Sequence, residues 1–321
     1  MFNQSLITAG ILGVCVGDAL GLPVQFSKRE ERERSPISDM IGYGTYHQPP
    51  GTWSDDGSLT LCLVDALSQV SPNHPEKLLT LVSQNFCRWY SEGYLTPFNR
   101  AFDIGGTTER SVNHLLQGVS LKHSGQNSEK SNGNGSLMRI LPLAFCHNLL
   151  VFPELIKLTH LTSAITHAHL RSQIACGFYI SIAVRLLAGE SAKTAYLQGI
   201  ENIKKIYSKP PYIVELQHFS RFTDGKIEQL KINDIASSGY VVDTLEASLW
   251  CLINSENYAE AVLKAVNLGD DTDTTAAVTG GLAGIYYGLE SIPQHWLDQL
   301  IKKQDIIDLA QVFATKLKSG Y

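Results

Sequence analysis

The chain has 321 residues, of which 44% are hydrophobic and 18% charged; these values are ordinary for a globular protein and exclude a disordered or fibrous chain. Its formal net charge of -5 argues against a nucleic-acid duplex as the main partner, because phosphate backbones bind to basic faces. Length alone allows one large domain or two ordinary ones.

The N-terminal segment MFNQSLITAGILGVCVGDALG is apolar, but it has no basic start and Asp18 follows closely. We therefore expect a buried helix rather than a signal peptide, and no other segment has an apolar run long enough to predict a membrane span. The six cysteines are scattered through apolar segments without a C-x-x-C pair, which favours reduced thiols over disulfides or a zinc site. The alternating charges of residues 28–34 indicate a solvated helix face or loop.

Most apolar segments show the i, i+3, i+4 recurrence of α-helices, and strand-like alternation is scarce. Clear examples are residues 58–70, 75–93, 171–189 and 244–255. Glycine and proline clusters at 42–53, 102–109, 123–136 and 208–212 indicate loops within one domain, and residues 209–236 form the most irregular stretch. The sequence therefore predicts an all-α fold, one bundle of many helices spanning residues 1–321.

Two acidic clusters stand at expected helix starts, more than two hundred residues apart. Ser54, Asp55 and Asp56 form the first, and the second is GDDTDT, which contains Asp270, Asp271, Asp273 and Thr274. A single such cluster is commonly a helix cap. A cap needs one oxygen, however, and the two clusters together hold five aspartates, so the surplus charge needs a cation. Oxygen donors without cysteine or histidine suit two Mg²⁺ or Mn²⁺ ions, with Ca²⁺ as the alternative and Zn²⁺ disfavoured.

The second cluster does not form an EF-hand loop. Counted from Asp271, position 6 is Ala276 rather than glycine and position 12 is Leu282 rather than glutamate. The apolar residues 276–284, which follow the cluster, are mostly small. They would let this helix pack closely enough to bring the two acidic clusters together.

Three further segments carry polar groups suited to a ligand. Residues 131–145, SNGNGSLMRILPLAF, combine a glycine-rich loop with an expected helix start, which gives either an anion site or a plain turn. No Lys-Ser or Lys-Thr follows the glycines, so a Walker loop is not supported. The spacing of two between His167 and His169 would place them on different faces of a helix, and we expect one of them to hydrogen-bond a ligand. Tyr240 either stacks on a base or anchors the core.

These segments, in chain order, resemble the ADP-ribosylglycohydrolase family, which includes the dinitrogenase reductase-activating glycohydrolase and the ADP-ribosylarginine hydrolases. The resemblance runs from about residue 8 to about residue 297. It implies an orthogonal bundle of α-helices with two Mg²⁺ or Mn²⁺ ions at the bottom of a cleft. It also implies hydrolysis of the N-glycosidic bond between ADP-ribose and a modified side chain, above all arginine, which reverses mono-ADP-ribosylation. The segments that carry it are GVCVGDALGLPVQF, TWSDDGSLTLC, FDIGGTTE, GNGSLMR, THAHLRSQ, SGYVVDTLEASLW and NLGDDTDTTAAVTGGLAG.

By motif position, the resemblance also implies roles for particular residues. Asp55 or Asp56 would orient or deprotonate the attacking water, Asp103 is the candidate for proton transfer to the leaving group, and Asp270 would support the metal ligands. The metal ligands would be Ser54, Asp55, Asp56, Asp271, Asp273 and Thr274, and the residues that bind ADP-ribose would be Gly133, Asn134, Gly135, Ser136, His167 and Tyr240.

Two residues depart from the family pattern. Gln25 stands where many relatives carry glutamate, and Gly57 stands where a threonine or serine usually follows the aspartate pair. These departures keep open a catalytically weak ADP-ribose-binding protein, or a hydrolase of an O-linked or nucleobase-linked ADP-ribosyl conjugate. A divalent-metal phosphohydrolase that acts on a nucleotide is the alternative that does not depend on the resemblance.

The expected protein is a cytoplasmic, monomeric enzyme. Its partner would be an ADP-ribosylated protein or a small ADP-ribosyl conjugate. Neither nucleic acid nor a membrane is expected as a main partner.

Overall fold

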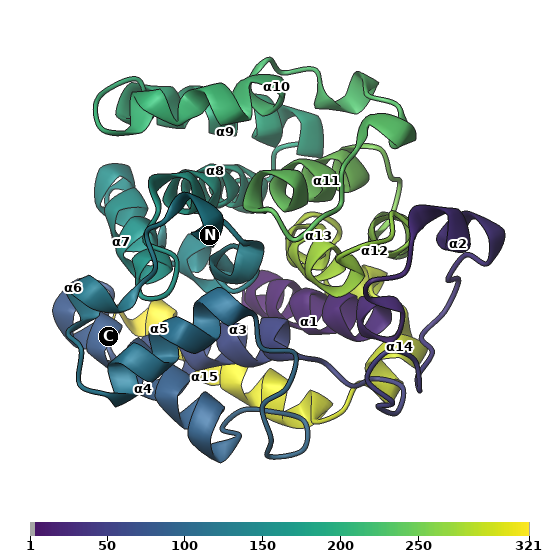
Figure 1. The fold of residues 1–321 in the computed structure, drawn as a ribbon, viewed down its shortest axis with the longest axis horizontal. Coiled ribbons are helices and arrows are strands. Elements are labelled where there is room, and N and C mark those ends of the chain that lie inside the picture. The colour runs from purple at the N-terminus through teal and green to yellow at the C-terminus, as the bar shows by residue number, and fades with distance from the viewer. Residues whose placement is uncertain (1–3, 321) are drawn as a thin grey trace.

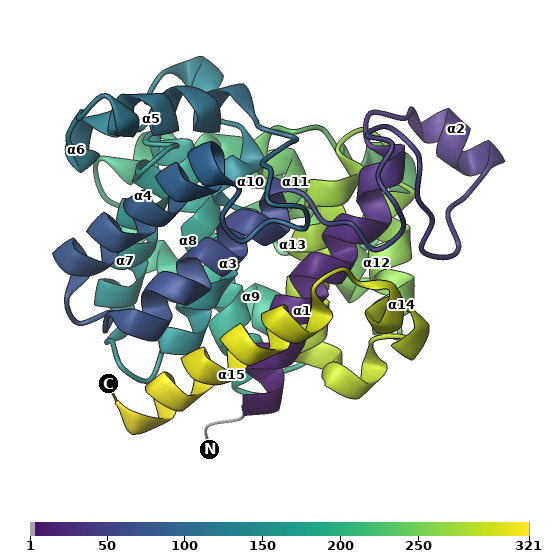
Figure 2. The same ribbon diagram turned by 90° about the horizontal axis from the view of Figure 1, so that it is seen from below.

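The computed structural model describes residues 4–320, so residues 1–3 and 321 of the predicted domain lie outside the described part. The described chain folds into α-helices and short 3-10 helices that cross in several directions (Figures 1 and 2). Within residues 4–320, β structure is limited to two isolated bridges, Gln126 with His167 and Gly133 with Tyr240. The all-α prediction is confirmed.

The α-helices are spread along residues 4–320. Their bounds are α1 Gln4–Gly21, α2 Arg29–Arg34, α3 Asp55–Gln69, α4 Pro75–Glu92, α5 Gly106–Leu116, α6 Leu121–Ser124, α7 Phe152–Ala164, α8 Leu170–Leu187, α9 Ala192–Tyr207, α10 Ser220–Thr223, α11 Val241–Ile253, α12 Tyr258–Val266, α13 Thr272–Tyr287, α14 Gln294–Gln299 and α15 Lys303–Ser319.

Helices α1 and α13 run side by side through the middle of the bundle (Figures 1 and 2). Their backbones touch because small residues face each other: a Cβ atom on Gly17 would lie 2.1 Å from the carbonyl oxygen of Ala276, and one on Gly21 would lie 2.4 Å from the Cα of Asp273. The close packing expected of residues 276–284 is therefore observed, with α1 as the partner helix.

The expected helices at 58–70, 75–93, 171–189 and 244–255 correspond to α3, α4, α8 and α11. The charged segment at 28–34 forms the exposed helix α2, which projects from the edge of the molecule (Figure 1). The segments 4–24 and 170–187 have the length and hydropathy of membrane-spanning helices, but 89% and 72% of the residues in their most apolar 18-residue windows are buried inside the structure, as in core helices.

Two expectations about local structure are wrong. Residues after Ser136 do not start an α-helix; instead Asn134–Ser136 and Leu141–Cys146 form separate 3-10 helices, and Pro142 in the second lacks the backbone donor that an α-helix interior needs. His167 and His169 do not share a helix either, because His169 is the N-cap of α8 and accepts a hydrogen bond from the N–H of Arg171.

Candidate active site

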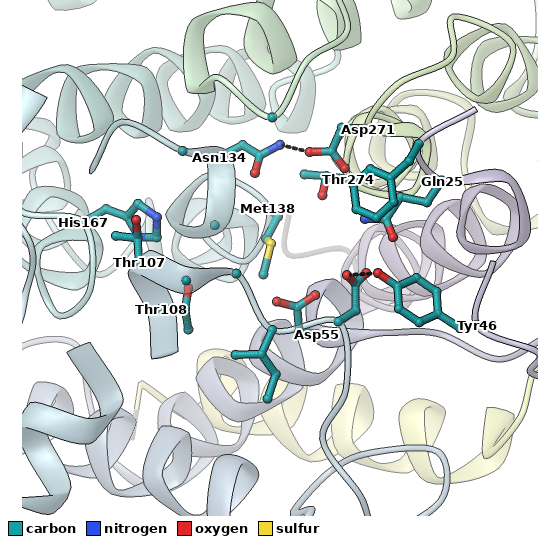
Figure 3. Close-up of a pocket in the computed structure, with 18 residues that line it drawn as sticks. Gln25, Tyr46, Asp55, Thr107, Thr108, Asn134, Met138, His167, Asp271 and Thr274 are labelled. Atoms are coloured by element: carbon teal, nitrogen blue, oxygen red, sulfur yellow. Dashed lines mark hydrogen bonds between the residues drawn. The ribbon is translucent and has the colours of Figure 1, made fainter. Parts of the chain in front are cut away.

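A cavity of about 560 Å³ lies where the loops before α3, α5, α11 and α13 meet. Figure 3 shows His167, Thr107 and Thr108 toward one end of the cavity and Gln25, Tyr46, Asp271 and Thr274 toward the other. The complete lining consists of Gln25, Phe26, Tyr46, Asp55, residues 103–108, residues 133–135, Met138, His167, Gly239, Asp271 and Thr274.

The start of α3 places the first acidic cluster. Ser54 is the N-cap, but its Oγ is 3.5 Å from the N–H of Asp56, so this hydrogen bond is weak. The main cap comes from Asp18 on α1, whose carboxylate accepts the N–H of Ser54 at 2.9 and 2.8 Å and the N–H of Gly57 at 2.8 Å. Asp18 therefore satisfies the helix start, and the carboxylates of Asp55 and Asp56 are left for the site.

The start of α13 brings the second cluster to the first. The hydroxyl of Thr274 lies 3.5 Å from Asp56 Oδ2, although the two residues are 218 positions apart. Carboxylate oxygens of Asp18, Asp56 and Asp273 all lie within 4.8 Å of one another. The predicted meeting of the two acidic clusters is therefore observed in the structure. Because both oxygens of Asp18 already accept backbone N–H groups, we assign Asp18 to capping rather than to cation binding.

These carboxylates are buried together, and within residues 4–320 protein donors satisfy only part of their oxygens. Burial raises the pKa values of Asp55, Asp56 and Asp273 well above the usual range, and neighbouring carboxylates raise them further. Burial also raises the pKa of Asp18 to about 7. Within residues 4–320, one buried oxygen of each of four aspartates has no hydrogen-bond partner: Asp56 Oδ1, Asp103 Oδ2, Asp271 Oδ1 and Asp273 Oδ2. Unpartnered carboxylate oxygens with hydroxyls beside them are a donor set that fits hard divalent cations.

Asp103 joins the acidic end from the loop before α5. Its backbone is left-handed, with φ +56°, and Tyr46 donates a hydrogen bond of 2.5 Å from its hydroxyl to Asp103 Oδ1. Burial raises the pKa of Asp103, while the hydrogen bond from Tyr46 lowers it. Tyr46 was missed in the sequence because it lies in a glycine-rich loop with no motif of its own.

At the other end of the cavity, His167 lies beside the glycine-rich loop. Its Nδ1 is 2.8 Å from the hydroxyl of Thr166, and burial lowers its pKa to about 3, so the ring is neutral at physiological pH. A Cβ atom on Gly135 would lie 2.9 Å from His167 Cε1, so glycine is needed for this close approach. Thr107 and Thr108 also line this end and were missed, because hydroxyl residues at a helix start look like caps.

Two side chains of the glycine-rich loop form hydrogen bonds within the protein. The amide of Asn134 donates to Asp271 Oδ2 at 2.7 Å and to Thr244 Oγ1 at 2.9 Å, so it ties the loop to the acidic cluster. The hydroxyl of Ser136 is buried and accepts a hydrogen bond of 2.9 Å from Ser163. Contacts of this loop with phosphate would therefore have to come from backbone N–H groups other than that of Asn134, which donates to the carbonyl of Gly239 at 3.0 Å.

Two other predicted residues lie off the cavity. Asp270 is exposed and lines a separate surface hollow with Arg29, because its left-handed backbone, φ +58°, turns it away from Asp271. Tyr240 is half-buried at the start of α11 outside the cavity lining, and the guanidinium of Arg171 lies 5.9 Å from its ring centre. Contrary to the expectation from the sequence, the Asp270 side chain therefore does not lie beside the proposed metal ligands.

The two departures from the family pattern both lie at the acidic end. Gln25 is buried and lines the cavity, and its Oε1 has no hydrogen-bond partner within residues 4–320. Gly57 fits against Trp53, since a Cβ atom there would lie 2.9 Å from Trp53 Cε3. A side chain at position 57 would therefore require the Trp53 ring to shift.

The fold and the site together define an all-α protein with a carboxylate-lined cleft that can hold divalent cations. The family model for ADP-ribosylglycohydrolase matches residues 3–320, and the chain belongs to this family. The resemblance stated from the sequence is confirmed.

Relatives of known name agree with this family. The chain is 32% identical to ADP-ribosylarginine hydrolase Tri1 of Serratia proteamaculans, over 94% of this chain and 76% of the relative. It is 29% identical to the ADP-ribosyl-[dinitrogen reductase] glycohydrolase of Rhodospirillum rubrum, over 91% of this chain and 89% of the relative. A solved ADP-ribosylglycohydrolase-related protein complex has a similar fold, with a TM-score of 0.74, 28% identity and coverage of 97% of this chain and 98% of that chain. These matches support ADP-ribosyl glycohydrolase activity.

Proposed function

We propose that this protein is a hydrolase that uses two Mg²⁺ or Mn²⁺ ions to cleave the N-glycosidic bond between ADP-ribose and an arginine side chain. The observation that carries the proposal is the meeting of two acidic clusters at one end of a cavity whose other end is a glycine-rich loop beside His167. Such a cavity can receive the ribose hydroxyls at its acidic end and the phosphates at the other.

The choice of arginine rests on two arguments. Relatives 32% and 33% identical to this chain bear the name ADP-ribosylarginine hydrolase. In addition, the acidic end of the cavity suits a guanidinium leaving group, which is a planar cation with several N–H donors.

The proposed metal ligands are Ser54, Asp55, Asp56, Asp271, Asp273 and Thr274, whose hydroxyls and buried carboxylates meet at the starts of α3 and α13. Bound divalent cations would supply positive charge that binds sugar hydroxyls and acidifies a water molecule.

The chain's own residues would carry the remaining steps. Asp55, whose carboxylate lines the cavity, orients the attacking water together with its neighbour Asp56. Asp103 would deliver a proton to the leaving nitrogen while Tyr46 fixes its position, and burial, which raises the pKa of Asp103, favours its acid form. His167 and the backbone of the glycine-rich loop bind the diphosphate.

An assay of free ADP-ribose release from an arginine-modified protein, with Mg²⁺ and with EDTA, tests the proposal. We expect release of ADP-ribose to depend on Mg²⁺. Asp55→Asn or Asp273→Asn should reduce it at least about a hundredfold, since each replaces a charged metal ligand with a neutral amide. Asp270→Asn is the matched control, because this neighbouring aspartate is exposed and faces another hollow, and it should keep wild-type activity. Full activity in EDTA, or in both site variants, would overturn the proposal.

A catalytically weak ADP-ribose-binding protein is the second candidate, and the observation in its favour is Gln25. This neutral amide lines the acidic end of the cavity and cannot act as a base. Tight binding of ADP-ribose without release would support this candidate, and a large gain in rate for Gln25→Glu would show that the amide limits catalysis. Release of inorganic phosphate would point instead to a phosphohydrolase, and release from O-linked or nucleobase-linked conjugates to another linkage.

We further propose that the chain works as a single-domain monomer in the cytoplasm. One hydrophobic cluster takes in side chains from α1 to α15, which supports a single domain. All six cysteines are free, which suits a reducing compartment.

A further inference from the structure

Arg139 is a fully buried cation directly behind the glycine-rich loop. Within residues 4–320 it forms no ion pair with a carboxylate, and its guanidinium lies 4.7 Å from the centre of the Phe86 ring. It donates to the carbonyl of Gly135, to the hydroxyl of Thr166 at 2.9 Å and to the carbonyl of Thr162 at 3.4 Å. Burial of a charge without an opposite charge beside it costs free energy. We therefore expect Arg139 and its three hydrogen bonds to have a role beyond packing.

Thr166 connects Arg139 to His167. A guanidinium can only donate hydrogen bonds, so the hydroxyl oxygen of Thr166 accepts from Arg139. The hydroxyl hydrogen of Thr166 can then be donated to another acceptor. Within the described residues, the other group in reach of this hydroxyl is His167 Nδ1, at 2.8 Å. The threonine hydroxyl therefore donates to Nδ1, and Nδ1 carries no hydrogen.

This arrangement determines which ring nitrogen of His167 is protonated. Burial, together with the positive charges of Arg139 and Arg110, lowers the pKa of His167 to about 3, so the ring is neutral. A neutral imidazole with a bare Nδ1 has its hydrogen on Nε2. In the described chain Nε2 has no hydrogen-bond partner, and it lies at the cavity wall, 3.7 Å and 3.3 Å from where Cβ atoms on Gly133 and Gly135 would be.

We propose that Arg139 and Thr166 are positioning residues that hold His167 as an Nε2–H donor aimed into the cavity, where it binds an anionic phosphate group. The choice of ligand rests on the proposed function, because the diphosphate is the anionic part of ADP-ribose. The placement also fits the polarity of the cavity: a donor and the buried cation Arg139 stand at one end, and the carboxylates of Asp55, Asp103 and Asp271 stand toward the other. Figure 3 shows this separation between His167 and Asp271.

The direct test is the tautomer of His167 in the ligand-free, full-length protein. Histidine-labelled protein is measured at pH 7 by ¹⁵N-detected correlation of the ring, and the His167 signals are assigned from their absence in His167→Gln. We expect a proton on Nε2 and an Nδ1 resonance typical of a nitrogen that accepts a hydrogen bond. A proton on Nδ1 would overturn the proposal.

Thr166→Val then removes the hydroxyl while keeping the side-chain shape. We expect the Nδ1 resonance to move to that of a nitrogen without a hydrogen bond, and the Kd for ADP-ribose to rise about tenfold, as for one hydrogen bond to a charged ligand. KM should rise by a similar factor with little change in kcat, and Thr166→Ser should restore the wild-type values.

Thr162→Val is the matched control, because the buried hydroxyl of Thr162 has no hydrogen-bond partner within residues 4–320, and it should leave the Nδ1 resonance and ADP-ribose binding unchanged. Wild-type binding by Thr166→Val would overturn the positioning role. Failure of the proposed function is distinguishable: the wild type would show the Nε2–H tautomer yet bind no ADP-ribose, which overturns the phosphate ligand and leaves the hydrogen-bond chain in place.

Discussion

Asp18 is an acidic side chain on α1 that completes the start of a different helix. Its carboxylate accepts the N–H groups of Ser54 and Gly57, which would otherwise be buried at the start of α3 without partners. Its position therefore fixes the direction in which α3 presents Asp55 and Asp56. One capping contact thus couples a core helix to the candidate active site.

We expect Asp18→Ala to lower the free energy of unfolding by about 1–3 kcal/mol for each of the two orphaned N–H groups. The measurement is urea denaturation in EDTA at pH 5, which is below the pKa of about 7 for Asp18. At this pH the substitution removes no buried negative charge, so relief of charge repulsion does not offset the stability lost with the cap. Asp18→Asn keeps one acceptor and should lose less, and the exposed Asp270→Asn should match the wild type. Equal midpoints for Asp18→Ala and the wild type would show that the cap is not needed.

At the scale of the elements, the contact between α1 and α13 determines where the second acidic cluster lies. A Cβ atom on Gly21 would lie 2.4 Å from both the nitrogen and the Cα of Asp273, and the hydroxyl of Thr272 donates to the carbonyl of Gly21 at 2.8 Å. The start of α13 therefore rests directly on the end of α1. The spacing between Asp273 and the cluster on α3 depends on how closely these two helices approach.

We expect Gly17→Ala to force the two helices apart, because the new methyl group would lie 2.1 Å from a backbone oxygen of α13 that cannot rotate away. Overpacking of this kind costs about 1–3 kcal/mol, and the displaced Asp273 should also weaken Mg²⁺ binding. Guanidinium denaturation and calorimetric titration of Mg²⁺ measure the two effects. Gly105→Ala, whose added carbon would meet nothing within 4 Å, is the control for stability. An unchanged Mg²⁺ affinity in Gly17→Ala would show that the contact between α1 and α13 does not determine the geometry of the metal site.

At the scale of the whole molecule, the buried aspartates make stability depend on pH and on cations. A carboxylate whose pKa is higher in the folded state than in the unfolded state stabilises the fold fully below its unfolded pKa, and this contribution is lost as pH rises through the folded pKa. The folded value is about 7 for Asp18, and burial raises those of Asp55, Asp56 and Asp273 well above the usual range. The metal-free fold is therefore weakened near neutral pH by its own active-site charge.

We expect the Tm of the protein in EDTA to fall between pH 6.5 and pH 8. The buried His160 and His167 have lowered pKa values, about 4 and about 3, and act in the opposite direction only below about pH 6.5, so they do not oppose the aspartates in this window. Excess Mg²⁺ should raise Tm more at pH 8 than at pH 6.5, because protons compete with the cation. Differential scanning calorimetry in both conditions measures this, and a metal-free Tm that rises toward pH 8 would contradict the argument.

Several helices, and the chemistry at the start of two of them, can be predicted from the amino-acid sequence alone. Apolar recurrence predicted α3, α4, α8 and α11, because it reports which face of a helix is buried. The aspartates at the starts of α3 and α13 were likewise visible, because a helix start is a local feature and its surplus charge can be counted from neighbouring residues.

Which side chains reach the cavity depends on contacts between distant segments of the chain. Tyr46 reaches Asp103 across 57 positions, and Asn134 turns to Asp271 across 137 positions. Asp270, by contrast, faces another hollow because its own backbone is left-handed. The physical reason is that periodicity and caps depend on residues a few positions apart, whereas the orientation of a side chain at a site depends on partners from distant segments. Those partners meet only after α1 and α13 have packed.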